Sequence, residues 1–231
     1  MKVKSLFLSI ALLLVASGAG AADDNVSVVR PLAIKAGKTQ KVAIALENAK
    51  SYTAFQMDIK LPEGLTLSNP KSLRTSDATF HNITAGEVDG VTRVVALSYK
   101  TEEDGKTILE GNGNKEFIDG NSEIILYFDI TASDTYVDNG NIEVKNVKFV
   151  DSDGNTQAIA DASSENGSVL GDVNSDKDVT AQDASLVLQG VANKITLTIK
   201  QKGVGNVNFD EDVTAQDASL ILQKVAGKVD L

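Results

Sequence analysis

The C-terminal part of the chain contains an internal near-repeat, and this feature constrains the fold more than any other. The stretch GDVNSDKDVTAQDASLVL at residues 171–188 returns as GNVNFDEDVTAQDASLIL at residues 205–222. In each copy, Asp and Asn occupy alternate positions ahead of the shared segment DVTAQDASL, and an apolar helical pattern follows. A repeat of this kind predicts two copies of one small structural unit, each a polar loop followed by a helix.

The spacing of the polar residues matches the ligand positions of a twelve-residue calcium loop. Such loops use oxygen atoms from positions 1, 3, 5, 7, 9 and 12, with position 7 contributing its main-chain carbonyl. We therefore predict two Ca2+ ions. The first set of ligands is Asp172, Asn174, Asp176, Asp178, Thr180 and Asp183. The second set is Asn206, Asn208, Asp210, Asp212, Thr214 and Asp217.

Both loops depart from the usual EF-hand pattern. Position 6 holds Lys177 or Glu211 where glycine is preferred, position 12 is Asp, and no helix precedes either loop. The second loop begins with the neutral Asn206, so we expect the second site to be weaker. The alternative is a pair of acidic turns that only cap helices, with Thr180 and Asp183 as a capping box. Capping leaves the alternating Asp and Asn residues ahead of it unexplained.

The segments ASLVLQGVA and ASLILQKVA predict two short helices with one buried stripe each. The stripes are Ala184, Val187, Leu188 and Val191 in the first helix and Ala218, Ile221, Leu222 and Val225 in the second. A tail of about 60 residues with two short helices has little core of its own. We therefore expect metal binding to contribute to its folding.

The tail, residues 170–231, resembles a type I dockerin, a duplicated calcium module in which each half is a loop followed by a helix. The resemblance implies the ligands given above and a cohesin as partner. The implied partner-binding residues lie opposite the buried stripes: Ala181, Gln182, Leu186, Gln189 and Asn193, with Ala215, Gln216, Leu220 and Gln223. Because the halves are nearly identical, either helix is expected to dock on the partner. Basic residues often found on that face are absent, so the sequence does not specify which cohesin is bound.

The part before the tail shows the two-residue period of half-buried strands, which indicates a mainly β fold. The alternating sets include Val42, Ile44 and Leu46; Phe55, Met57 and Ile59; Val95, Leu97 and Tyr99; and Ile124, Leu126, Phe128 and Ile130. Eight or nine strands over residues 23–169 predict an antiparallel β-sandwich. A change of phase between Val144 and Val147 predicts a bulge. Asp151-Ser152-Asp153-Gly154 is interpreted as a hairpin turn and not as a third calcium loop.

The order of features in residues 23–169 resembles a cohesin, a jelly-roll sandwich that binds dockerins. The features are VRPLAIKAGKTQKVAIALENAKSYTAFQMDIKLPEGLTL, then SEIILYFDITA, and the closing VKFVDSDGNTQAIADASSENGSV. A glycan-binding sandwich shares much of this pattern. The absence of tryptophan argues against sugar stacking, although Tyr52, Tyr99, Tyr127 and Tyr136 are candidate substitutes.

Residues 1–22 predict a secretory signal peptide: two lysines, the apolar run LFLSIALLLVA and small residues at the end. The mature protein is then exported, either secreted or at the periplasm or cell surface. Cysteine is absent, which excludes disulfides and cysteine zinc sites, and the net charge of −10 disfavours nucleic acid as a partner.

No catalytic pattern stands out in the sequence, since the single histidine, His81, is far from any nucleophile motif. We therefore expect a non-catalytic, calcium-binding assembly protein. Its partners are expected to be cohesin or dockerin modules on other chains or on itself, in a setting of polysaccharide degradation. The alternative is an adaptor whose sandwich binds polysaccharide while the tail recruits other proteins.

Overall fold

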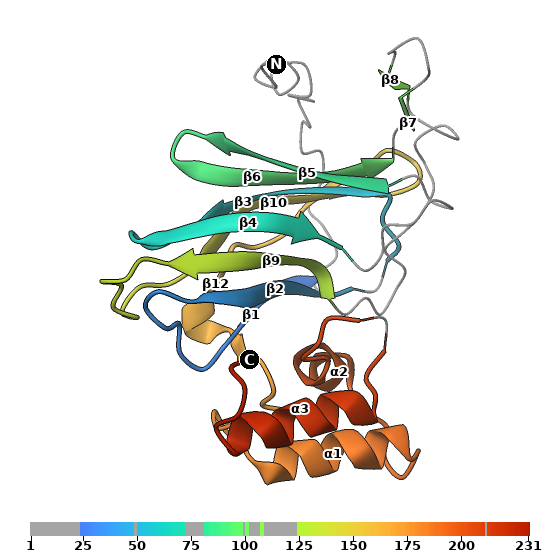
Figure 1. The fold of residues 1–231 in the computed structure, drawn as a ribbon. Coiled ribbons are helices and arrows are strands. Elements are labelled where there is room, and N and C mark those ends of the chain that lie inside the picture. The colour runs from blue at the N-terminus through green and yellow to red at the C-terminus, as the bar shows by residue number, and fades with distance from the viewer. Residues whose placement is uncertain are drawn as a thin grey trace.

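The computed structural model describes residues 24–48, 50–72, 81–98, 100–101, 107–108, 124–210 and 212–231. The predicted signal peptide, Tyr99 and Glu211 lie outside these ranges. Two β-sheets pack face to face, and a helical tail lies below them (Figure 1). The prediction of a mainly β sandwich followed by a small helical unit is confirmed. No helix in the described ranges has the length and apolar character needed to cross a membrane.

The first sheet has the strand order β13-β1-β2-β9-β4. Its strands are β1 (Asn25–Arg30), β2 (Thr39–Glu47), β4 (Leu65–Lys71), β9 (Ile124–Ala132) and β13 (Ser168–Val169). All neighbours are antiparallel except β1 and β13, which run parallel. The last strand of the sandwich therefore ends beside the first.

The second sheet has the order β11-β10-β3-β6-β5, and β12 also pairs with β10. Its strands are β3 (Ala54–Lys60), β5 (His81–Val88), β6 (Val91–Ser98), β10 (Glu143–Val150), β11 (Thr156–Ala158) and β12 (Ala162–Ser163), while β7 (Lys100–Thr101) and β8 (Thr107–Ile108) form a separate pair. Eight described strands have six or more residues, as predicted. The remaining strands of the described ranges are only two or three residues long.

Two local predictions for the second sheet are confirmed. The register of β10 against β3 shifts between Lys145 and Lys148, and Asn146 has a positive φ of 51°, so the strand bulges there. Asp151 starts the β10–β11 hairpin turn, in which the amide of Gly154 donates to the Asp151 carbonyl at 3.1 Å. The Asp151 carboxylate caps the same turn by accepting from the amides of Asp153 and Asn155. This side chain is therefore explained by the turn.

The sandwich core forms where alternate residues of both sheets meet. Its largest fully buried side chains include Tyr52, Phe55, Phe128 and Phe149. The predicted alternation is correct in β2 and β3. In β9 it is correct from Leu126 to Ile130, but Ile124 belongs to the tail's core cluster and Ile125 to that of the sandwich. In β6 it is wrong. There Val94 and Ala96 are fully buried, and Val95 is only half-buried on the opposite face. Valine and alanine alternate with apolar neighbours in TRVVALS, so periodicity alone did not identify the inner face.

The tail contains three helices, α1 (Ala181–Val191), α2 (Ile199–Gly205) and α3 (Ala215–Val225). The sequence pattern predicts only α1 and α3. The segment IKQKGVG of α2 lacks an amphipathic pattern and carries two glycines, which disfavour helices. A capping box between Thr198 and Gln201 starts this helix. In Figure 1, α2 lies between the sandwich and the α1–α3 pair.

The main chain is hydrogen-bonded where it passes from the sandwich into the tail. The amide of Leu170 donates to the Arg30 carbonyl, and that of Gly171 donates to the Val204 carbonyl, both at 2.8 Å. A Cβ at Gly167 would lie 2.3 Å from the Val28 carbonyl oxygen, so this close approach to β1 requires glycine. The sandwich and the tail are therefore joined by packed, hydrogen-bonded chain.

Candidate functional site

The first predicted calcium loop folds around its own oxygen atoms. The buried Asp172 carboxylate accepts from the amides of Asp176 at 3.1 Å and Lys177 at 2.9 Å. The Asn174 side chain accepts from the Asp176 amide at 2.9 Å and donates to the Asp176 carboxylate at 2.8 Å. Lys177 has a φ of 73°, the left-handed conformation for which glycine is preferred at this position. Positions 1, 3 and 5 of the loop are thus brought together.

Position 12 closes the loop and also caps the helix. Asp183 is fully buried, and its Oδ1 accepts from the amides of Val173 and Asn174 at 2.8 and 3.0 Å. Its Oδ2 accepts from the Thr180 amide at 2.8 Å, which completes the capping box. The alternative capping geometry is therefore present. The capping box uses only Thr180 and Asp183. It does not account for the polar residues at positions 1, 3 and 5.

The second loop has the same architecture. Asp217 is fully buried and accepts from the amides of Val207 and Thr214 at 3.0 and 2.8 Å. The Asn208 side chain donates to the Asp210 carboxylate at 2.5 Å and accepts from the Asp210 amide at 3.0 Å. Asp212 is exposed, as is its counterpart Asp178, in keeping with a position expected to act through its carbonyl. The two loops, which are nearly identical in sequence, therefore also form nearly the same hydrogen bonds.

The first residue of each loop places a buried oxygen where a cation would stabilise it. Asn206 is buried, and its Oδ1 has no hydrogen-bond donor, whereas its Nδ2 donates to the Asp210 carbonyl at 2.7 Å. In the first loop, burial raises the pKa of Asp172, and repulsion from Asp183 raises it further, against the amide hydrogen bonds that lower it. A buried oxygen without a donor and a buried carboxylate beside another are both stabilised by a cation.

The acidic side chains do not by themselves form a closed metal cluster. Across the described ranges, no three Asp, Glu or His side chains converge on one point that suits a metal ion. The loop amides occupy several carboxylate oxygens, as described above. The donor set nevertheless consists only of carboxylate, amide and hydroxyl oxygens, which are the ligands that Ca2+ prefers. The residues present therefore fit a calcium ion in chemistry.

The helix surface differs from the predicted one. Ala184 and Val187 are buried as expected, but Leu188 is 44% and Val191 41% exposed. Leu186, predicted to be exposed, is half-buried and packs against the tail core. The buried side of α1 is thus rotated towards Leu186, because α3 and α2 determine which side is covered.

Helix α3 differs from its predicted surface in the same way as α1. Ala218 and Ile221 are buried, whereas Leu222 is 44% and Val225 48% exposed. Leu220 is half-buried, like Leu186. The exposed apolar residues Leu188, Val191, Leu222 and Val225 are named the apolar helix face below. They stand at equivalent positions of the two repeats.

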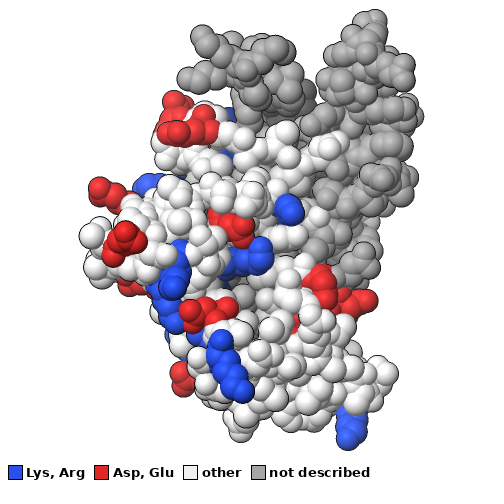
Figure 2. All heavy atoms as spheres, in the orientation of Figure 1, with Lys and Arg blue, Asp and Glu red and all other residues white. Residues whose placement is uncertain are grey.

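The other predicted partner-binding residues are exposed or half-buried. Ala181, Gln182, Asn193, Ala215 and Gln216 are exposed. Gln189 and Gln223 are half-buried, and each donates along its own helix, to Ser185 at 3.2 Å and to Ser219 at 3.4 Å. In Figure 2, the visible surface over α1 and α3 carries few charged side chains. This end of the molecule offers apolar and neutral polar groups to a partner.

Residues 170–226 match the family model described as the dockerin type I domain. The identification of the tail as a dockerin module from its repeated loops is therefore confirmed. The match covers about a quarter of the chain. No curated protein is significantly similar to this chain.

Several solved structures are similar over the sandwich at low identity. The cohesin module of a family 33 glycoside hydrolase from Clostridium perfringens is 14% identical, with 62% of this chain and 94% of that chain covered and a TM-score of 0.45. The sixth cohesin of scaffoldin B from Acetivibrio cellulolyticus, solved in complex with a dockerin, is 14% identical. The match covers 62% of this chain and 97% of that chain, with a TM-score of 0.43. The major pilin SpaD from Corynebacterium diphtheriae is 14% identical. The match covers 61% of this chain and 34% of that chain, with a TM-score of 0.36.

Proposed function

We propose that this chain is an exported, calcium-dependent assembly protein whose dockerin tail binds a cohesin module on another chain. One observation carries the proposal: a tail matching the dockerin family presents the same exposed apolar pair twice, Leu188 with Val191 and Leu222 with Val225. Contiguous exposed apolar side chains mark interaction sites on soluble proteins. Neutral glutamines at their border supply hydrogen bonds.

Two Ca2+ ions are proposed to hold the tail in its binding form. In the first loop the ligands are Asp172, Asn174, Asp176, Asp178, Thr180 and Asp183; in the second they are Asn206, Asn208, Asp210, Asp212, Thr214 and Asp217. When bound, calcium neutralises the buried carboxylates and ties each loop to the start of its helix. The loops thereby fix the positions of α1 and α3, and the partner surface with them.

The sandwich is proposed to bind protein as a cohesin-like module. The tail covers part of the outer face of the first sheet, and within the described ranges no helix packs on the outer face of the β11-β10-β3-β6-β5 sheet. On it, Arg93 donates to both oxygens of the buried Asp58 at 2.7 and 2.8 Å. Asn146 also donates to Asp58, at 2.8 Å. This rigid polar pattern is suited to hydrogen bonding with a protein surface.

Glycan binding by the sandwich is the less supported alternative. Of the candidate stacking residues, Tyr52 and Tyr136 are buried, at 1% and 8% exposed. The ring of Tyr127 is stacked against Phe209 of the tail. The described tyrosines are therefore engaged in packing, which leaves them unsuited to stacking on a sugar ring. A setting in polysaccharide degradation would then come from the partners of the protein.

We propose a partner on another chain because of the position of the tail relative to the two sheets. The α1–α3 pair lies below the first sheet, and the β11-β10-β3-β6-β5 sheet lies on the opposite side of the sandwich (Figure 1). A tail held in this way does not reach the second sheet of its own chain. Head-to-tail contacts between chains would then remain open-ended.

The test is calorimetric titration of the full chain with purified cohesin modules and with a second copy of the chain, in calcium and in EGTA. We expect binding in calcium and at least a hundredfold loss in EGTA. The double variant Leu188→Glu with Leu222→Glu should lose binding to a similar extent. Either single variant should lose only a few fold, since the other repeat still docks.

Leu32→Glu is the matched control, because Leu32 is 50% exposed but belongs to the sandwich. It should bind like the wild type. Binding that survives both EGTA and the double variant would refute the proposed surface. Sedimentation with insoluble cellulose or xylan, in place of cohesin binding, would favour the glycan-binding adaptor.

A further inference from the structure

The outer face of the first sheet carries an apolar patch that faces the tail. Val29, Ala43 and Ile124 are nearly or fully buried, yet they belong to the tail's core cluster and not to that of the sandwich. Gly203 of α2 lies over this patch, where a Cβ would be 3.9 Å from Ile124. Buried apolar side chains on the outer face of a sheet require a cover, and here the tail supplies it.

The second loop makes the most specific contact with this patch. Phe209, at loop position 4, is 5% exposed, and its ring stacks on Tyr127 of β9 with centroids 5.4 Å apart and an interplanar angle of 28°. The Lys41 ammonium lies 5.4 Å from the centroid of the same tyrosine ring. Aromatic pairs in this range of separation contribute beyond their buried area.

The first loop has the same backbone but no such contact. Position 4 is Ser175 there, with a φ of 62° against 58° for Phe209. Ser175 is exposed, whereas Phe209 is buried against the sandwich. A bulky residue with positive φ is uncommon and carries strain. The packing of Phe209 against Tyr127 offsets this strain, and no comparable compensation is needed at Ser175.

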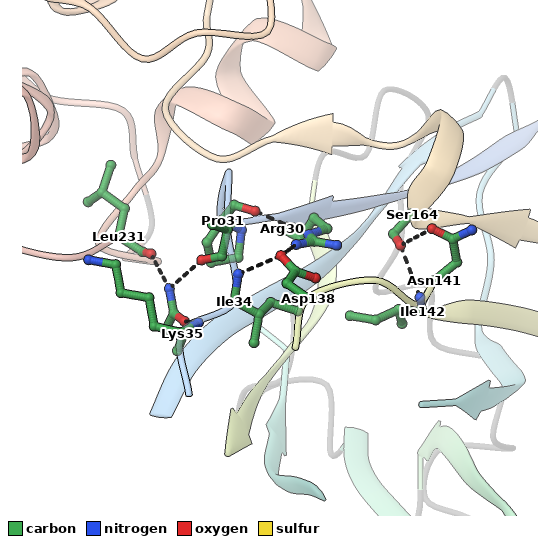
Figure 3. A network of polar contacts seen from close by, with 11 residues as sticks. Arg30, Pro31, Ile34, Lys35, Asp138, Asn141, Ile142, Ser164 and Leu231 are labelled. Carbon is green, nitrogen blue, oxygen red and sulfur yellow. Dashed lines mark hydrogen bonds and ion pairs between the residues drawn. The ribbon is translucent and has the colours of Figure 1, made fainter. Parts of the chain in front are cut away.

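The C-terminus adds polar contacts to the same interface. Lys35 forms an ion pair with Asp230, and its hydrogen bond lowers the pKa of that carboxyl. The Leu231 carbonyl accepts from the Gln40 side chain at 3.2 Å. Figure 3 shows Leu231 beside the segment that carries Lys35, close to the Arg30–Asp138 pair. The Lys35–Asp230 pair is partly exposed, so it orients the tail more than it stabilises it.

We infer that the second loop is the docking element that fastens the tail to the sandwich, so that calcium in this loop and docking of the tail stabilise each other. This inference rests on the proposed calcium function. Phe209 lies between Asn208 and Asp210, two of the proposed ligands. A calcium-bound loop holds the backbone on both sides of Phe209 in the conformation that reaches Tyr127.

Thermodynamic linkage makes this coupling reciprocal. If calcium in the second loop favours docking, then docking must raise the calcium affinity of that loop by the same factor. In the first loop, position 4 is the exposed Ser175, so the aromatic contact that would link calcium binding to docking is present in the second loop and not in the first. The two loops are therefore expected to respond differently to a change at the interface.

The test is Phe209→Ser in the full chain, which gives the second loop the residue of the first. Calorimetry measures calcium affinity, and methyl NMR of Ala43 and Ile124, beneath the tail, reports docking. We expect about a fivefold loss of affinity at one site, an unchanged second affinity, and shifts of both methyl signals towards their positions in EGTA. The Met57 methyl, in the sandwich core, should not move and so shows that the sandwich stays folded.

Two further variants distinguish loss of the interface from misfolding of the loop. Tyr127→Ala leaves both loops intact and should cause the same loss of affinity and the same methyl shifts. Ser175→Phe is the matched control and should change neither. Methyl signals that are identical in calcium and EGTA, or docking that persists in both interface variants, would overturn the inference. Absence of any calcium binding by the wild type would instead overturn the proposed function.

Discussion

The two repeats of the tail share their loop sequence, their capping boxes and their exposed apolar pair, but their surroundings differ. The first loop faces solvent at Ser175, and the second is pressed against the sandwich through Phe209. The first starts with a buried carboxylate, Asp172, and the second with a buried neutral amide, Asn206. The two repeats thus share one local structure, and tertiary contact distinguishes them.

This difference suggests a division of tasks within one small module. The helices of both repeats offer a similar surface to a partner. The second loop also packs on the sandwich through Phe209, a contact that the exposed Ser175 of the first loop does not make. A neutral ligand at position 1 reduces the charge that must be buried next to the apolar interface, since burying an unpaired charge is costly. The site that we expect to be weaker is therefore the one whose loop packs against the sandwich.

The strongest test of the comparison is removal of calcium from both loops. In EGTA the tail should lose most of the helical signal of α1 and α3 in circular dichroism, because its few buried side chains do not hold it without metal. The sandwich should keep its cooperative thermal unfolding. Addition of excess calcium should restore the helical signal. Equal helicity with and without calcium would show that the loops fold as simple helix caps.

The next test separates the repeats at position 12. Asp183→Asn and Asp217→Asn each remove one buried carboxylate and should lower calcium affinity at their own loop by about tenfold or more, which corresponds to about 1.4 kcal/mol. Calorimetry should show one weakened site in each variant. Only Asp217→Asn should also move the Ala43 methyl signal. Identical effects on docking would contradict the assignment of docking to the second loop.

The smallest expected effect concerns the first ligand of the second loop. Asn206→Asp restores the residue type of the first loop and should raise calcium affinity of the second site by a few fold to about tenfold, because ligand charge tunes affinity. Asp172→Asn is the reciprocal change and should weaken the first site by a similar factor. A fall in affinity for Asn206→Asp would mean that the apolar interface does not tolerate the extra charge.

Sequence reasoning succeeded where the structure depends on neighbours along the chain. The capping boxes at Thr180 and Thr214, the bulge after Val144 and the Asp151 turn follow from residues a few positions apart. The spacing of the loop oxygens follows from the same local order, and their role as calcium ligands stays a prediction. Helix α2 was missed because its glycines and lysines give no amphipathic signal, and its place is set by packing between β2 and the α1–α3 pair.

The sequence by itself determined that the tail is a duplicated loop–helix module and which oxygen atoms each loop offers, since both follow from spacing within about a dozen residues. Tertiary structure alone decided that Leu188 and Leu222 are exposed while Leu186 and Leu220 are half-buried, and that Phe209 belongs to an interface with Tyr127. The physical reason is that burial depends on partners distant in the chain. Two nearly identical repeats therefore differ in role because only one of them touches the sandwich through its loop.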